Sequence, residues 1–392
     1  MAVLDDAGRL ACLRLIRSEN VGPVTFRELI NHYGGAEKAL AVLPELSRRA
    51  GRSGAIAICP ASRAEAELEA ARRLGARPIF TIEPGYPPAL ASLDAPPPLL
   101  YVKGREELLG RPMVAMVGSR NASAAGTRMA RMLATRIGAE GYVVVSGLAR
   151  GIDSATHEAA LATGTVAVLA GGIDFVYPPE NEDLYARIAD KGCLVTELPP
   201  GFQPRAQDFP RRNRIISGVA LATIVVEAAK RSGSLITART ANEQGRLVMA
   251  VPGHPLDPRA EGPNGLIRQG AIMITSADEV VAELAPLRHR APGAEPRPTL
   301  AEPPVSTPLP APRGQAGTGS IRRSADAGIP GSSPVDAVEA VLGVLGPAPA
   351  TLDEVARAAG IPAHVAKVAL LELALAGRIE QHGGQLVSLR SE

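Results

Sequence analysis

MVAMVGSRNASAAG, residues 113–126, joins a short apolar run to a turn of small and polar residues. The run has the length of a buried strand, and a helical pattern begins where the turn ends. Similar apolar runs recur along the chain at 142–146, 165–170, 193–198, 221–228, 247–251 and 271–275. Short apolar strands separated by helix-length segments are typical of a parallel sheet covered on both faces. The pattern predicts an α/β fold with a Rossmann-like, doubly wound, mainly parallel sheet.

The bulk composition is that of a globular protein with more than one domain. The chain has 392 residues, of which 46% are hydrophobic, so two or three domains are expected. Its three cysteines have no pairing or metal-ligand spacing. The first ten residues carry acids where a signal peptide would carry lysines, and no apolar run reaches the ~20 residues of a membrane span. We expect a cytoplasmic protein without metal, cofactor or membrane contact.

Composition also divides the chain into four parts. Residues 1–75 have helical patterns and form an N-terminal head, which we expect to be a SAM-like or helix-hairpin-helix-like domain. The strand-rich body spans 76–286. Residues 287–334 are rich in proline and alanine and contain no aromatic residue, which predicts a disordered linker. The tail, 335–392, has its own apolar periodicity.

The tail pattern predicts a winged-helix domain. A first helix covers 335–345, and Thr351 with Glu354 forms a capping box for a second that ends at Gly360. A third covers 361–377, and a hairpin follows around Gly383 and Gly384. The third helix carries little charge for entering a major groove, so a protein-contact or autoregulatory role stays as open as DNA reading.

Ligands of such sheets lie beyond the carboxyl ends of the strands. At one of these ends, GSRNASAAG (118–126) offers backbone N–H groups and the positive end of a helix dipole to an anion. Ser119 and Ser123 add hydroxyl donors, and Arg120 adds a guanidinium. The turn is not GxGxxG, which disfavours a dinucleotide. The alternative is a tight turn with an exposed arginine.

Two further turns at the same predicted edge have a similar character. SGLARGIDS (146–154) is rich in glycine, and EAAKRSGSLITA (227–238) provides donors on Lys230, Ser232 and Gly233. A single nucleotide needs one or two such turns. Three turns on one edge favour a chain of phosphates.

FPRRNRIISG (209–218) is the most basic stretch of the chain. Residues 201–240 hold seven basic side chains against two acidic ones. Arginines so close repel one another unless an anion lies among them. Guanidinium groups can hold phosphates, an asparagine can bond a base edge or sugar, and a phenylalanine ring can stack on a base. The candidates are Phe209, Arg211, Arg212, Asn213 and Arg214. The alternative is a solvated basic turn that begins a helix.

Six ordered motifs within 76–285 resemble one protein family. They are VGSRNASAAG, VVSGLARGIDSATHEAAL, GGIDFVYPPEN, FPRRNRIISG, EAAKRSGSLITARTANEQGR and VPGHP. This set is similar to the DNA-processing protein A (DprA, also called Smf) family of bacteria, and the head, linker and tail suit its longer members.

The resemblance implies a function and a set of contacts. It implies a homodimer that is not an enzyme, binds and protects single-stranded DNA, and loads the RecA recombinase in natural transformation. It implies main contacts from Arg120, Arg212, Asn213 and Arg214. Ser119, Lys230, Ser232 and Gly233 would complete the groove. The loop after YPP is acidic here, through Glu180, Glu182 and Asp183, which puts a DNA contact from that loop in doubt.

An enzyme of a different class shares this body. Phosphoribohydrolases that act on nucleoside monophosphates carry a PGGxGTxxE pattern. The matching stretch here, AKRSGSLITARTANE, lacks the glycine pair and the spaced acid. Glu197 and Glu227 remain candidate general bases for this alternative. A scaffold that binds only protein would leave the arginines unexplained.

Overall fold

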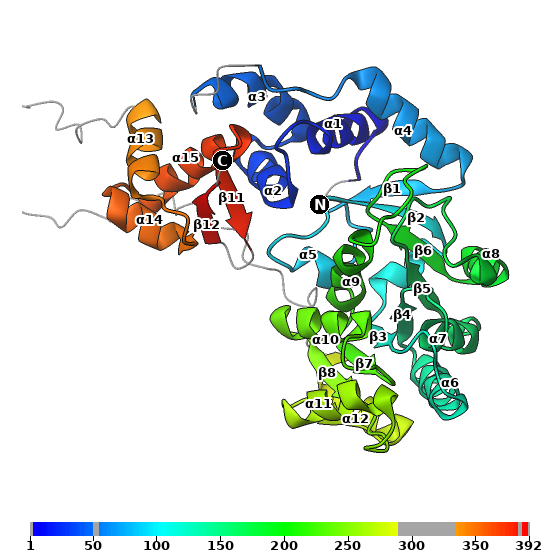
Figure 1. The fold of residues 1–392 in the computed structure, drawn as a ribbon. Coiled ribbons are helices and arrows are strands. Elements are labelled where there is room, and N and C mark those ends of the chain that lie inside the picture. Colours follow the sequence, from blue (N-terminus) through cyan, green and yellow to red (C-terminus); the bar gives the residue numbers. More distant parts are fainter. Residues whose placement is uncertain (1–2, 50–54, 289–333, 383–385, 391–392) are drawn as a thin grey trace, which may run out of the picture.

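A computed structural model describes residues 3–49, 55–288, 334–382 and 386–390. The head packs above one end of the body, and the tail lies beside the head (Figure 1). The head consists of helices α1 (Asp6–Ile16), α2 (Pro23–Tyr33), α3 (Ala36–Arg49) and α4 (Ala61–Arg73). Nearly all of the predicted linker, residues 289–333, lies outside the described residues.

The body contains a nine-stranded sheet with the order β1-β2-β6-β5-β4-β3-β7-β8-β9. The strands are β1 (Arg77–Phe80), β2 (Leu99–Gly104), β3 (Met113–Val117), β4 (Val143–Ser146), β5 (Thr165–Val168), β6 (Cys193–Thr196), β7 (Ala222–Val225), β8 (Leu247–Ala250) and β9 (Ile272–Met273). Strands β3 to β9 pair in parallel, whereas β1 pairs with β2 and β2 with β6 in antiparallel fashion. The predicted Rossmann-like, mainly parallel sheet is confirmed.

Helices cover both faces of this sheet. They are α5 (Pro88–Ala91), α6 (Ala124–Ala139), α7 (Ile152–Ala160), α8 (Glu182–Lys191), α9 (Asp208–Gly218), α10 (Gly233–Glu243), α11 (Glu261–Arg268) and α12 (Ala277–Arg288), with 3₁₀ helices at Glu106–Gly110, Pro179–Asn181 and Pro258–Ala260. Alternate residues of β3 enter two cores: Met113 joins the cluster that contains Ile215 of α9, and Val114 joins the cluster that contains Leu133 of α6. A strand buried on both faces therefore has a continuous apolar sequence.

The sequence prediction missed two strands and placed one element wrongly. Strands β1 and β2 extend the sheet in the antiparallel sense, and β2 divides its apolar residues between the body and head cores. The stretch FPRRNR is not a turn, because it forms the first two turns of α9. Its side chains therefore project in different directions around a helix rather than along one surface.

The head is attached to the body by a polar network as well as by apolar packing. Tyr101 of β2 donates its hydroxyl hydrogen to Glu67 of α4 at 2.5 Å, and Arg17 of α1 pairs with the same carboxylate at 2.7 Å. The apolar cluster of the head includes Phe80 and Leu99 of the body strands. Head and body thus share one core.

The tail has the predicted winged-helix architecture. It contains α13 (Pro334–Val344), α14 (Leu352–Ala359), α15 (Ala363–Leu375) and strands β10 (Ala350–Thr351), β11 (Ile379–His382) and β12 (Leu386–Leu389), in the sheet order β10-β12-β11. The predicted capping box of Thr351 and Glu354 is present, and Gly360 ends α14 with a positive φ. The predicted turn at Gly383 and Gly384 lies outside the described residues.

None of the helices in the described ranges has by itself the length and apolar character of a membrane span, although α14 and α15 meet that criterion together across a bend of 106°. The domain division at 75/76 and 286/287 remains our proposal. The first boundary falls between α4 and β1, and the second falls within the last turn of α12.

Candidate nucleic-acid interface

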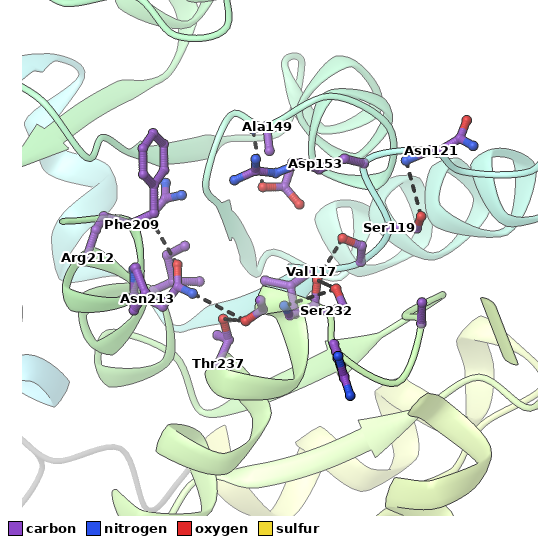
Figure 2. A pocket seen from close by; sticks show the side chains of 18 of the residues that line it. Val117, Ser119, Asn121, Ala149, Asp153, Phe209, Arg212, Asn213, Ser232 and Thr237 are labelled. Carbon is purple, nitrogen blue, oxygen red and sulfur yellow. Dashed lines mark hydrogen bonds between the residues drawn. The ribbon is translucent and has the colours of Figure 1, made fainter. Parts of the chain in front are cut away.

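A cleft of about 710 Å³ opens where the strand order reverses, between β3 and β7. This is the position at which doubly wound sheets bind their ligands, because the loops from neighbouring strands leave in opposite directions there. The cleft lies between the N-terminal ends of α9 and α10 and the turn after β3 (Figure 2). Residues of all three segments line it: Phe209 and Asn213 of α9, Ser232 and Thr237 at the start of α10, and Ser119 and Asn121 after β3.

The turn after β3 contributes Ser119, Arg120 and Asn121 to the cleft wall. The hydroxyl of Ser119 accepts a hydrogen bond from the Asn121 N–H at 3.1 Å, which shapes the turn. Gly151 adopts a φ of +78°, and a side chain there would collide with the carbonyl oxygen of Ser119. The turns after β3 and β4 therefore pack closely only because residue 151 is glycine.

The structure places Ser123 outside the lining of the cleft, so its predicted contact with nucleic acid stays a prediction. It caps α6 by accepting from the Gly126 N–H, and its own N–H and hydroxyl both donate to the carboxylate of Glu227. A carboxylate thus occupies the helix N-terminus that was predicted to hold phosphate. The dipole of α6 stabilises Glu227 instead of a ligand.

The turn before α10 supplies the second wall. Ser232 caps the helix and, with Gly233 and Ser234, lines the cleft. The Ser234 hydroxyl donates to the Gly118 carbonyl at 2.7 Å and so links this turn to the end of β3. Lys230 is exposed but does not line the cleft, whereas its neighbour Arg231 does. The structure thus adds Arg231 to the candidates in this turn, and a contact from Lys230 stays a prediction.

Two of the three clustered arginines share one carboxylate of the protein. Glu197, whose side chain is 9% exposed, pairs with Arg211 at 3.2 Å and with Arg214 at 2.5 Å. Arg214 also donates to the carbonyl of Ala95. Neither arginine lines the cleft. One carboxylate of the chain thus balances one of these two charges, and the contact of Arg211 and Arg214 with phosphate stays a prediction.

Arg212 lies under the cleft floor and is 6% exposed. Its Nη1 donates to the carbonyl oxygens of Gly147 and Val168, and its Nε donates to Asn213. The buried carboxylate of Asp153 provides the opposing charge and accepts from the Gly147 N–H at 3.1 Å. Burial nevertheless lowers the pKa of Arg212 to about 10. This guanidinium holds the ends of β4 and β5 together and faces the cleft from below.

An aromatic pair and an arginine form the rim. Phe209 and Tyr177 pack edge to face with ring centroids 5.3 Å apart, and the Arg120 guanidinium lies 5.5 Å from the Phe209 centroid. Tyr177 is 45% exposed. Asn213 donates to the Gly233 carbonyl at 3.4 Å, which joins the two cleft walls. A cation beside exposed rings suits a planar ligand attached to an anion.

The acidic loop after YPP turns one carboxylate toward the cleft entrance. Glu180 pairs with Arg150 at 3.6 Å, and both side chains are more than half exposed. Arg150 lines a small hollow next to the cleft, together with Tyr177. Exposed ion pairs of this kind are weak, so Arg150 can exchange this partner for another anion.

His157 lies fully buried near Arg212 and makes stability depend on pH. Burial and the charge of Arg212 lower the pKa of His157 to about 3, so the ring stays neutral in the folded protein. An exposed histidine takes up a proton near pH 6.5, and the unfolded chain therefore binds one more proton below that pH. From this residue alone, we expect the free energy of unfolding to fall by ~1–2 kcal/mol between pH 6.5 and pH 5.

The test compares urea unfolding of the wild type and His157→Asn at both pH values. The asparagine amide can take the place of Nδ1, which bonds the Thr165 hydroxyl at 2.7 Å. The variant should be less stable overall but lose less stability between the two pH values. An equal loss in both proteins would show that His157 is not the group responsible.

Sequence reasoning missed Arg231, Asn121 and Thr237 as cleft residues. Arg231 directly precedes the helix cap Ser232, and Asn121 follows the two predicted residues of its turn. Their proximity to a predicted helix start was the available signal. Nothing in the sequence indicated Thr237. It lies one turn into α10 and reaches the cleft because that helix turn places it there.

Three family models match the chain in order. A model for DNA recombination-mediator protein A matches residues 77–285, one for a DprA-like N-terminal HHH domain matches 6–70, and one for a DprA winged helix domain matches 327–385. Together they cover the head, the body and the tail. The model for the body alone spans more than half of the chain.

Individual relatives give the same result. The chain is 45% identical to Protein Smf of Escherichia coli over 202 residues, which are 51% of this chain and 54% of that protein. It is 44% identical to DNA processing protein DprA of Bacillus subtilis over 220 residues, 55% of this chain and 74% of that one. The match thus spans about half the length of the Escherichia coli relative.

A solved structure resembles the fold. The X-ray structure of DNA processing protein A from Streptococcus pneumoniae superposes with a TM-score of 0.61 at 32% identity. The superposition covers 72% of this chain and 99% of that one.

Proposed function

Because the chain belongs to the DNA recombination-mediator protein A family, we propose that it binds single-stranded DNA through the cleft between β3 and β7. The observation that carries the proposal is the composition of that cleft. In the part of the chain that the structure describes, Arg120 and Arg231 line it without an ion-pair partner, beside the aromatic pair of the rim and the N-terminus of α10. The two arginines and the helix N-terminus suit phosphates, and the aromatic pair suits bases.

The proposed binding mode follows from the geometry of a duplex. Bases in a duplex are stacked on one another and cannot splay onto Phe209 or Tyr177, whereas those of a single strand can. The strand would pass from Arg120 across the rim to the turn at Arg231, while Arg212 fixes the floor. Binding of this kind tolerates many sequences and weakens with salt.

The wider role of the protein extends the proposal. The Bacillus subtilis relative is a DNA processing protein by name. We propose that this protein, in the cytoplasm and as a homodimer, protects incoming single strands and loads RecA on them during natural transformation. These parts rest on the family resemblance, and each is separable from DNA binding.

The comparisons do not favour the phosphoribohydrolase alternative. Its two candidate bases are engaged elsewhere, since Glu227 bonds Ser123 at the start of α6 and Glu197 pairs with two arginines. Neither carboxylate lines the cleft.

Fluorescence anisotropy of a labelled single-stranded oligonucleotide at several salt concentrations tests the proposal. Arg120→Ala and Arg231→Ala should each weaken binding and reduce the slope of log K against log salt by about one. Arg211→Ala is the matched control, because it removes the same charge from a residue that pairs with Glu197 and does not line the cleft. Its slope should stay close to that of the wild type.

Four results would count against parts of the proposal. Equal affinity for duplex and single strand at moderate salt would remove the stacking mode. An equal effect of all three arginine variants would move the DNA path away from the cleft. Absence of binding by the wild type would overturn the function, and release of free base from nucleoside monophosphates would then be measured. Binding without RecA loading would remove only the partner.

A further inference from the structure

The third helix of the tail, α15, presents one face to the head. Lys367, Leu371 and Leu375 recur every fourth residue and so form one stripe along the helix. The two leucines are at most 5% exposed and belong to the apolar cluster of the head rather than to that of the tail. Helix α15 packs against α2 and α3, as Figure 1 shows beside the C-terminal end of the chain.

Polar contacts fix the position of this stripe. Lys367 pairs with Glu28 of α2 at 2.7 Å, and Asn20 donates its side-chain N–H to the carbonyl oxygen of Leu375 at 2.9 Å. A side chain at Gly377 would lie 3.2 Å from the Asn20 amide, so the two chains approach closely there. The contact therefore combines buried leucines, an ion pair and a bond to the free carbonyl end of a helix.

We propose that α15 is a docking helix for the head of the same chain, and that this contact is a reversible latch. A winged-helix domain that reads DNA inserts its third helix into a major groove. Here that helix has one lysine, which the head already pairs, and residues 335–392 hold four basic against seven acidic side chains. Phosphates would repel such a domain, whereas a protein surface accepts it. The inference is independent of the function proposed for the cleft.

Glu372 makes the latch reversible. Its side chain is 1% exposed, and its Oε1 has no hydrogen-bond partner among the described residues. The titratable head groups that act on it are Arg49 at the end of α3 and Tyr33 at the end of α2. Burial raises the pKa of Glu372, because the docked state disfavours its charge. Undocking returns this carboxylate to water. The cost of burying its charge therefore offsets part of the free energy gained when the leucines are buried on docking.

Energy transfer between two labels measures docking in the full chain. The native cysteines, Cys12, Cys59 and Cys193, are buried, so dyes can be directed to Glu65→Cys on the head and Ala358→Cys on the tail, both at exposed positions. The wild type should show a high-transfer population that excess unlabelled protein does not reduce. Transfer that unlabelled protein does reduce would mean docking between copies and would overturn the same-chain latch.

Two variants should shift the population in opposite directions. Leu371→Ala with Leu375→Ala should raise the ratio of undocked to docked chains at least tenfold, because two buried side chains lose their contacts. Neither residue belongs to the apolar cluster of the tail, so the tail should stay folded. Glu372→Gln removes the buried charge and should lower the same ratio. His364→Ala, on the exposed start of α15, is the control.

The outcomes separate the proposal from its competitors. A ratio unchanged in the double variant, or raised by Glu372→Gln, would overturn the latch. Duplex DNA binding is measured on the same double variant, which keeps every charge. If its affinity for duplex DNA equals that of the wild type, α15 is a docking helix. An affinity more than about threefold higher would show that the head masks a DNA-reading helix.

Discussion

Arg212→Ala is expected to lower the free energy of unfolding by about 3–5 kcal/mol. The substitution removes the charge that opposes the buried Asp153 carboxylate and leaves the Gly147 and Val168 carbonyl oxygens without their donor. A buried charge without its partner costs more than the pair contributed, because water cannot reach it. Urea denaturation followed by circular dichroism measures the change.

Two further variants make this result specific. Arg211→Ala removes the same charge from a side chain that is 56% exposed, and it should cost at most ~1 kcal/mol. Adding Asp153→Asn to Arg212→Leu removes both charges, so the pair should lose less than the sum of the single changes. Similar unfolding of Arg211→Ala and Arg212→Ala would contradict the assignment of Arg212 to the floor. If Arg212 does stabilise the floor, weak DNA binding by Arg212→Ala would reflect damage to the cleft rather than the loss of a direct phosphate contact.

Phe209→Ala should weaken single-stranded DNA binding by ~1–3 kcal/mol, which is roughly a 5- to 150-fold increase in Kd. The ring lines the cleft between the Arg120 guanidinium and Tyr177, where a base can stack in place of either neighbour. Phosphate contacts stay in place, so the dependence of affinity on salt should be unchanged. Anisotropy titrations at three salt concentrations separate the two effects.

Phe202→Ala serves as the matched control. Phe202 lies in the loop between β6 and α9 and does not line the cleft. Its loss should leave Kd within about twofold. An equal loss of affinity in both variants would indicate a general effect on the sheet edge, and a changed salt slope for Phe209→Ala would indicate that Arg120 moved with the ring.

The strands of the body were predictable because burial on both faces gives an uninterrupted apolar signal. Strand β3 begins and ends where the sequence indicated, at Met113 and Val117. Strand β1, with the sequence RPIF, begins with arginine and proline, so it gave no uninterrupted apolar signal. Strand β2 is apolar, but its antiparallel partner β6 lies far away in the sequence, and local sequence does not indicate this pairing.

The site was predictable in position and only partly in composition. Turns of glycine and serine after β3 and before α10 indicated the cleft, because local sequence determines where a helix starts. The partners of Ser123, Arg211 and Arg214 come from elsewhere in the chain. Glu227 is 104 residues from Ser123, and local sequence has no information on such a contact. Which charges remain free for a ligand is therefore a property of the tertiary fold.

The strand order has a consequence for synthesis of the protein. Strand β3 is made first among the parallel strands but lies at the centre of the sheet, with β4 on one side and β7 on the other. The chain must extend to residues 222–225 before β7 can cover the second side. At roughly 5–20 residues per second, this apolar edge stays open for on the order of ten seconds after β3 is complete. The nascent chain is then most exposed to aggregation at the strand that later forms the base of the cleft.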